Sequence, residues 1–151
     1  MDNNNLKEAE EARMRQRLQD LWTRSSGCLN SVLQMELISC DAEQQTCLFR
    51  AKTQSWMKNI AGTLHGGMGA TILDHAMGAM LYCTKEGESF SPTVEMQASY
   101  HRPLIPEKDV LIKARIVAKS KRLAHMAAEV YQADDPKKVC VSGTSVYFIT
   151  D

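Results

Sequence analysis

The chain of 151 residues has the length of a single domain, and with 44% hydrophobic residues it can bury a core of its own. Its 18 Lys and Arg residues balance its 18 Asp and Glu residues, so it lacks the basic excess typical of a nucleic-acid-binding protein. Glycines, two histidines and Asp74 interrupt the apolar stretch 60–83, which argues against a membrane span because a charge near the bilayer centre is costly.

The five cysteines are an odd number, are widely spaced and never form a C-x-x-C motif. Each lies among apolar residues, which predicts buried free thiols, and no spacing of histidines, cysteines and carboxylates indicates a metal site. The sequence has no N-x-S/T sequon, and its polar, charged N-terminus is unlike a signal peptide. We therefore expect a protein of the reducing cytoplasm.

The first predicted element is an amphipathic helix over residues 6–24. Its apolar residues recur at i, i+4, i+7 and i+8, namely Met14, Leu18, Leu21 and Trp22. Ser25-Ser26-Gly27 ends this helix, so residues 1–27 are expected to form a helical extension and residues 28–151 a single domain. Two strands are then predicted over residues 32–39 and 46–53, separated by a polar turn.

An apolar helix is predicted over residues 66–83, followed by strands over residues 93–101, 110–119, 123–132 and 139–149. Alternation places Val94, Met96, Ala98 and Tyr100 on one face of the first of these strands. A helix that is apolar nearly all round must be buried, and short connections favour antiparallel strands. We expect an α+β fold in which a six-stranded antiparallel sheet wraps around one long buried helix.

The start of the apolar helix carries candidate functional residues. Gly66 and Gly67 are poor helix formers, but at a helix start they let a ligand approach unpaired backbone N–H groups. Such a terminus can bind an anion or stabilise a developing oxyanion. A close-packed turn that needs small residues is the alternative explanation.

Asp74 is the only formally charged side chain between Lys58 and Lys85. A carboxylate buried without a partner is costly, and burial raises the pKa of such a group, so Asp74 is a candidate general base or nucleophile. The alternative is a helix Asp that bonds a nearby backbone group or reaches water. His75 follows it but points about 100° away around the helix, which indicates a structural or interfacial role.

Gly66 and Asp74 are about 12 Å apart along one helix, because the helix rises 1.5 Å per residue. They cannot both contact the same reacting carbonyl and its attacking water. If both are catalytic, the helix terminus of one chain must meet Asp74 of another, as in a two-fold dimer with antiparallel central helices.

The pattern N-x-x-G-x-x-H-G-G-x(6)-D, from Asn59 to Asp74, resembles the hotdog-fold acyl-CoA thioesterases of the phenylacetic-acid-degradation type. It is also similar to the mammalian mitochondrial-associated thioesterases of that group and to 4-hydroxybenzoyl-CoA thioesterases. The resemblance covers roughly residues 30–149. It implies an acyl-CoA substrate, no metal or redox cofactor, a homodimer at least, and a homotetramer as a dimer of dimers.

The resemblance also implies roles for individual residues. The Gly66 N–H would polarise the thioester carbonyl, and Asp74 of the partner chain would be nucleophile or general base. Asn59 would help to hold the water or the substrate, His65 would orient the loop and the thioester, and Thr93 would complete the site.

Coenzyme A phosphates need cations, and the sequence offers a small set of candidates. The predicted substrate-binding residues are Gly67, Arg102, Lys119, Lys121 and Arg122. For the basic turn 118–122, a solvated charged turn is the alternative explanation.

The hypothesis is therefore a cytoplasmic thioester hydrolase that releases a free acid and coenzyme A. A first rival is a hotdog protein that binds acyl-CoA as a sensor or scaffold without turnover, which would have no use for a buried carboxylate. A second rival is an enoyl-CoA hydratase, which would act without releasing a thiol.

Overall fold

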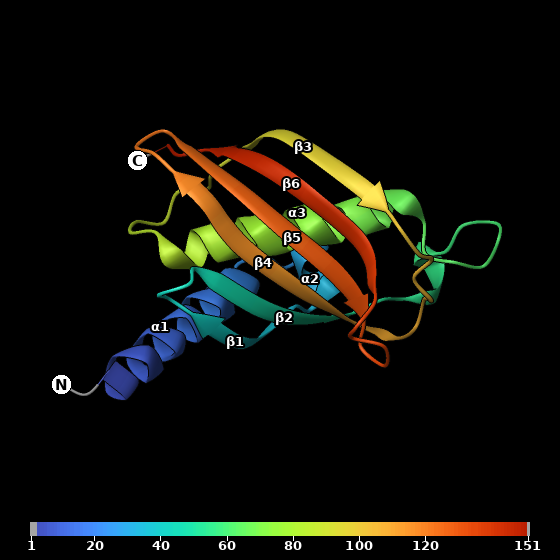
Figure 1. Cartoon of the computed structure of the whole chain (residues 1–151), viewed down its shortest axis with the longest axis horizontal. Helices are drawn as coiled ribbons and strands as arrows, with labels where there is room; N and C mark the ends of the chain where they lie inside the picture. Colours follow the sequence, from blue (N-terminus) through green and yellow to red (C-terminus); the bar gives the residue numbers. More distant parts are fainter. Residues whose placement is uncertain (1–2, 151) are drawn as a thin grey trace.

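A computed structural model describes residues 3–150, and Figure 1 shows how its helices and strands follow one another. The elements are α1 Asn3–Thr23, α2 Leu29–Leu33, β1 Glu36–Asp41, β2 Thr46–Lys52, the 3-10 turn Ser55–Met57, α3 Gly66–Thr84, β3 Thr93–Tyr100, β4 Asp109–Lys119, β5 Leu123–Gln132 and β6 Val139–Phe148.

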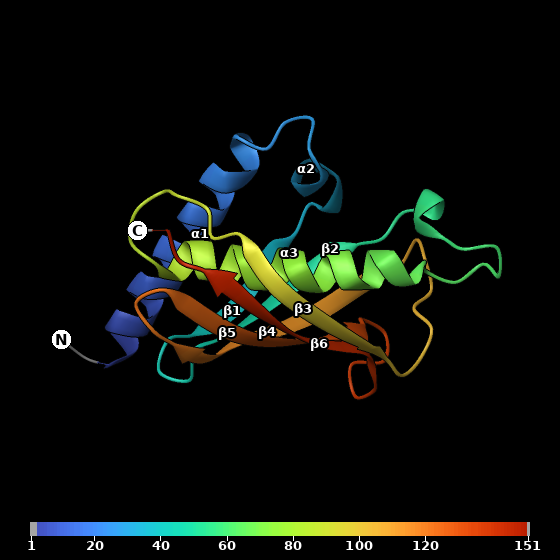
Figure 2. The ribbon, with the colours of Figure 1, turned by 90° about the horizontal axis from the view of Figure 1, so that it is seen from above.

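The six strands form one antiparallel sheet in the order β1-β2-β4-β5-β6-β3. Figure 2 shows α3 lying along one face of this curved sheet, whereas the opposite face, turned toward the viewer in Figure 1, carries no helix. The predicted fold, a six-stranded antiparallel sheet curved around one long helix, is confirmed.

The core lies between α3 and the inner face of the sheet. Ile72, Leu73 and Met77 of α3 are fully buried, as are inward-facing residues such as Ile112 and Val130 of β4 and β5. Packing against the sheet on one side and against α1 on another explains much of the apolar surface of α3. Between residues 3 and 150, no helix has both the length and the hydropathy that a membrane crossing requires.

Helix α1 packs into the same core through its predicted apolar stripe. Its residues Met14, Leu18 and Leu21 are buried. Arg15 donates hydrogen bonds to the carbonyls of Leu37 and Ile38 on the edge strand β1. The extension is therefore built onto the domain, and it covers the β1 edge of the sheet.

Two predictions in the segment before β1 are wrong. Where a strand was predicted from residue 32, the chain forms the short helix α2, which Gln34 ends with a left-handed φ of 43° before β1 starts at Glu36. A short apolar run does not distinguish a strand from a buried helix. Cys28, expected to be buried, is exposed beside α2, although all five thiols are free as predicted.

The second edge of the sheet is β3, and its apolar face is buried only in part. Met96 and Ala98 are half-buried against the core, but Val94 and Tyr100 are 61% and 53% exposed. The pairing of β3 with β6 shifts register between Thr93 and Glu95, which turns the start of the strand. This edge, unlike that of β1, lies open.

Candidate active site

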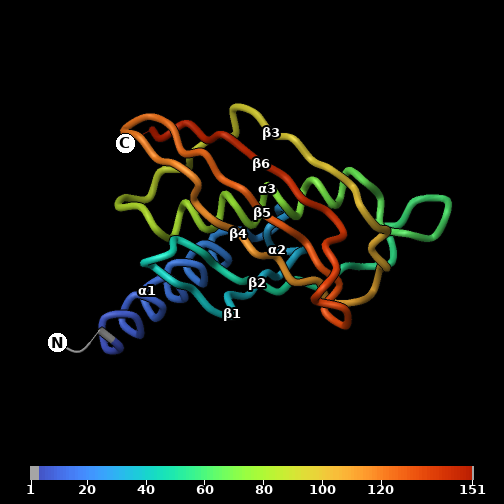
Figure 3. The backbone as a smooth tube through the Cα atoms, in the orientation of Figure 1, coloured from blue at the N-terminus to red at the C-terminus, as the bar shows by residue number. Residues whose placement is uncertain are grey.

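The loop that precedes α3 projects from one end of the molecule, at the right of Figure 3. The Asn59 side chain organises this loop from within. Its Oδ1 accepts hydrogen bonds from the N–H groups of Ala61 (2.9 Å) and Thr63 (3.2 Å), and its Nδ2 donates to Thr63 Oγ1 at 2.9 Å. Gly62 completes the turn with a φ of 82°. Asn59 thus fixes the loop, and its contact with water or substrate stays a prediction.

The two glycines at the N-terminus of α3 differ in whether their N–H groups are engaged. His65 is the N-cap, and its Nδ1 accepts a hydrogen bond from the Gly67 N–H at 3.0 Å. The Gly66 N–H has no hydrogen-bond acceptor among residues 3–150. Of the two glycines proposed from the sequence, Gly66 is therefore the one whose N–H can receive a ligand oxygen.

A hollow of about 370 Å³ adjoins this terminus. His65, Gly66 and Arg102 line it together with Tyr100 of β3. The Tyr100 hydroxyl donates a hydrogen bond to the Gly66 carbonyl at 2.6 Å, which ties the first turn of α3 to β3. The hollow is therefore a ready approach to the Gly66 end of the helix.

Asp74 is half-buried and has hydrogen-bond partners, so it is not a carboxylate buried without a partner. The Thr93 hydroxyl donates to its Oδ1 at 2.8 Å. The Tyr147 hydroxyl lies 2.8 Å from the same Oδ1 and 3.0 Å from the Asp74 backbone carbonyl. These donors come from β3 and β6, two strands that pair with each other.

The Tyr147 hydroxyl keeps its proton and donates a hydrogen bond to Asp74. Its side chain is fully buried, and burial, together with the charge of Asp74, raises the pKa of its hydroxyl far above the usual range. The proton therefore stays on Tyr147 at any physiological pH. Neither Tyr147 nor Tyr100 was identified as a site residue from the sequence, because both reach α3 from distant strands.

His75 faces away from Asp74, toward α1. Its ring stacks on Trp22 with a centroid separation of 5.0 Å and an interplanar angle of 21°. Burial lowers its pKa to about 4, against the opposing effect of the Asp74 charge. Its Nε2 is buried and has no hydrogen-bond partner among the described residues. The geometry is that of a packing residue between two helices.

The predicted substrate-binding cations fall into two groups at opposite ends of the sheet. Arg102 lies beside His65 and Gly66. The turn with Lys119, Lys121 and Arg122 lies at the other end of β4, where the Ile149 N–H donates to the Arg122 carbonyl at 2.8 Å. The turn is thus at the Thr93 and Tyr147 end of the sheet. One chain does not bring these two groups together.

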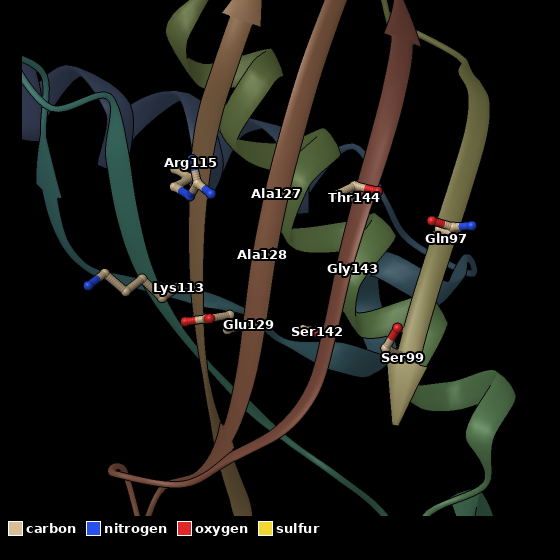
Figure 4. A pocket seen from close by; sticks show the side chains of 10 residues that line it. All are labelled: Gln97, Ser99, Lys113, Arg115, Ala127, Ala128, Glu129, Ser142, Gly143 and Thr144. Carbon is tan, nitrogen blue, oxygen red and sulfur yellow. The ribbon is translucent and has the colours of Figure 1, made fainter. Parts of the chain in front are cut away.

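A second hollow, of about 360 Å³, lies on the helix-free face of the sheet (Figure 4). Lys113 and Arg115 of β4 stand on one side of it, and Gln97 and Ser99 of β3 on the other. Helix α3 and Asp74 lie across the sheet from it, so it is separate from the candidate site. Nowhere in residues 3–150 are three or more His, Cys, Asp or Glu side chains grouped to hold a metal ion.

Comparison with known proteins gives agreeing results. The model of the thioesterase superfamily matches residues 61–139, more than half of the chain. Mouse acyl-coenzyme A thioesterase 13 is 31% identical over 94 residues, which are 62% of this chain and 65% of that protein. The chain thus matches a little less than two thirds of that relative.

Solved structures share the fold. The Escherichia coli PaaI protein of the phenylacetic acid degradation operon superposes with a TM-score of 0.78 at 13% identity, over 93% of this chain and 96% of that one. A Streptococcus mutans protein, whose structure was solved bound to acetyl-CoA, superposes with a TM-score of 0.66 at 18% identity, over 77% of this chain and 88% of that one. With the family match over residues 61–139, which include Gly66, Asp74 and Thr93, the chain belongs to the thioesterase superfamily.

Proposed function

We propose that this protein hydrolyses an acyl- or aryl-coenzyme A thioester to the free acid and coenzyme A. One observation carries the proposal: within residues 3–150, α3 holds an N–H without an acceptor, on Gly66, and a carboxylate, Asp74, that Thr93 binds through one oxygen while the other has no donor. Two comparisons support the substrate class, namely the name of the mouse relative and the acetyl-CoA bound to the Streptococcus mutans protein.

The proposed site is shared between two copies of the chain. Gly66 and Asp74 are eight residues apart on one helix, so about 12 Å separate them. A two-fold dimer with antiparallel α3 helices brings Gly66 of one protomer to Asp74 of its partner, twice. The open β3 edge, with exposed Val94, offers the surface for such pairing. A tetramer of two such dimers follows from the family resemblance alone.

The proposed chemistry uses the two ends of this shared site. The thioester oxygen accepts a hydrogen bond from the Gly66 N–H, backed by the helix dipole, as negative charge develops on it. Asp74 either takes a proton from the attacking water or attacks the acyl carbon itself. With water as the nucleophile, the new C–O bond gives the free acid; with Asp74 as the nucleophile, it gives an acyl-aspartate that a water then hydrolyses. In both cases the C–S bond breaks, its electron pair leaves on sulfur, and the proton released by the water converts the thiolate into the coenzyme A thiol. These steps need no metal or redox cofactor.

The remaining predicted residues support this arrangement. His65 holds the Gly67 N–H and so shapes the helix start, while Asn59 holds the loop before it. In an antiparallel dimer, Arg102 of one protomer and the basic turn 119–122 of its partner lie toward the same site. We propose that these cations bind the coenzyme A phosphates. We also propose that the protein works in the cytoplasm, because its five cysteines are free and free thiols persist there.

The decisive experiment is thiol release from a panel of aryl-, short-chain and long-chain acyl-CoA thioesters. For Asp74→Asn we expect kcat to fall by about 10²-fold or more, roughly 2.7 kcal/mol of barrier. Asp134→Asn is the matched control, because Asp134 is exposed and its carboxylate pairs only with Lys108 among the described residues.

Each other outcome has a definite meaning. Turnover that survives Asp74→Asn would refute the mechanism. Tight acyl-CoA binding without turnover of any thioester would favour the sensor or scaffold. Conversion of an enoyl-CoA without thiol release would favour the hydratase.

A further inference from the structure

The two oxygens of the Asp74 carboxylate have different surroundings. Thr93 Oγ1 and the Tyr147 hydroxyl both lie 2.8 Å from Oδ1. No group in residues 3–150 donates a hydrogen bond to Oδ2. Two donors on one oxygen fix the rotation of the carboxylate and leave the other oxygen for chemistry.

Resting on the thioesterase function proposed above, we infer that Tyr147 is a positioning residue for the reaction. It holds Oδ1, together with Thr93, so that Oδ2 of Asp74 is the atom that takes the proton or attacks the acyl carbon. The assignment holds whether Asp74 is the general base or the nucleophile. In both the free carboxylate and an acyl-aspartate, Oδ1 remains a hydrogen-bond acceptor. Tyr147 itself touches neither substrate nor reacting atom.

Tyr147 is well held for such a role. It is 2% exposed, and its strand position pairs with Thr93, so the two donors arrive from neighbouring strands. Its ring passes α3 at Gly78, where a Cβ would lie 3.8 Å from Tyr147 Cε1. The hydroxyl also lies 3.0 Å from the Asp74 backbone carbonyl, which is a second, slightly more distant acceptor for its single hydrogen.

The test is Tyr147→Phe, which keeps the ring and removes only the hydroxyl. We expect kcat to fall by about 10-fold or more with KM nearly unchanged, as for the loss of a hydrogen bond to a charged group. The acid limb of the kcat/KM profile should move to higher pH, because a donor to a carboxylate favours its charged form. Tyr131→Phe is the matched control, since that hydroxyl contacts Glu129 on the same strand β5.

Other titrating groups around Asp74 must be separated from this effect. The titratable neighbours are His75 on α3 and Tyr147 on β6, while β3 contributes the Thr93 hydroxyl. Burial lowers the pKa of His75 to about 4, so His75 can contribute to an acid limb of its own, and His75→Phe is measured beside Tyr147→Phe. A limb that Tyr147→Phe moves by the same amount with and without His75 does not report His75.

A second variant guards against a folding defect in Tyr147→Phe. Tyr147→3-fluorotyrosine keeps the ring and the hydroxyl but makes the hydroxyl a better donor, so the acid limb should move to lower pH. One result would overturn the role of Tyr147 and leave the proposed function standing. In that result, neither variant moves the acid limb, both keep a kcat near that of wild type, and Asp74→Asn is inactive. Wild-type protein that releases no thiol would overturn both.

Discussion

At the scale of single residues, Gly143 is the glycine that the packing of the sheet most clearly requires. A Cβ at this position would lie 2.6 Å from the Gln97 carbonyl oxygen and 2.8 Å from Leu73 Cδ1. The first contact is with backbone, which cannot turn away as a flexible side chain can. Gly143 thus allows β6 to lie close to both β3 and α3.

We therefore expect Gly143→Ala to lower the free energy of unfolding by about 1–3 kcal/mol, as overpacked cores do. Gly78→Ala is the control, because the nearest atom to its Cβ is 3.8 Å away and Ala favours a helix interior. Urea unfolding of both variants checks the prediction. Equal stability of the two alanine variants would contradict it.

Residue types in the sequence identified Asp74 as unusual, but its hydrogen-bond partners could not be predicted. Tyr147 is 73 positions away along the chain, and its hydroxyl meets Asp74 only because β6 pairs with β3 beneath α3. Thr93 was named through a family resemblance, and the structure places its hydroxyl on the Asp74 carboxylate. Spacing within a motif therefore located the carboxylate, whereas the surrounding donors depend on sheet order.

At the scale of elements, the contact between α1 and α3 includes a buried histidine. His75 stacks on Trp22, and the Trp22 Nε1 donates to the Met35 carbonyl at 2.6 Å. Burial lowers the His75 pKa to about 4, below the ordinary value of 6.5. The folded protein thus binds a proton at this position less readily than the unfolded chain does.

This difference predicts a pH dependence of stability. Because the folded pKa is lowered, the stabilising contribution is fully present above pH 6.5 and is lost as the pH falls toward 4. Between pH 7.5 and 5.0, His75 should account for about 2 kcal/mol of lost unfolding free energy. Urea titrations at these two pH values measure the loss.

His75→Phe is the variant that isolates this contribution, because it keeps an aromatic ring against Trp22 and removes the titrating group. Its loss of stability between the two pH values should be smaller than that of wild type by about the same 2 kcal/mol. The same pH dependence in wild type and variant would show that another group is responsible.

The elements themselves were predictable to different degrees. Strand β5 was predicted with its observed ends, Leu123 and Gln132, because its alternation of inward and outward residues is regular. Helix α2 was missed, because five residues are too few for a helical period to show. The register shift at the start of β3, where Val94 is exposed, leaves no mark in the pattern of residue types and could not be predicted.

At the scale of the whole molecule, the order of the strands determines which surfaces remain available for a second copy. Arg15 of α1 occupies carbonyls along the β1 edge, so that edge is covered. The β3 edge lies open, beside the half-buried face of α3 that carries Asp74. Pairing through the β3 side would therefore also bring two copies of α3 together.

A shared site makes a prediction that no single-chain site makes. Gly66→Pro removes the proposed oxyanion donor, and proline fits this position because it is the first residue of α3. The preceding His65, with φ −59° and ψ 136°, already has a backbone conformation that a following proline tolerates. Gly66→Ala is the control that keeps the N–H, and its Cβ would make only ordinary contacts with Tyr100.

Gly66→Pro and Asp74→Asn should each lose about 10²-fold in kcat, whereas Gly66→Ala should retain most of the activity. When the two inactive chains are assembled together in equal amounts, half of the dimers are mixed, and each mixed dimer holds one site with both native residues. The mixture should therefore regain about a quarter of wild-type activity. Distinct affinity tags on the two chains verify that mixed dimers have formed. Mixed dimers as inactive as either parent would refute the shared site, because only a site built from both chains can be restored by exchange.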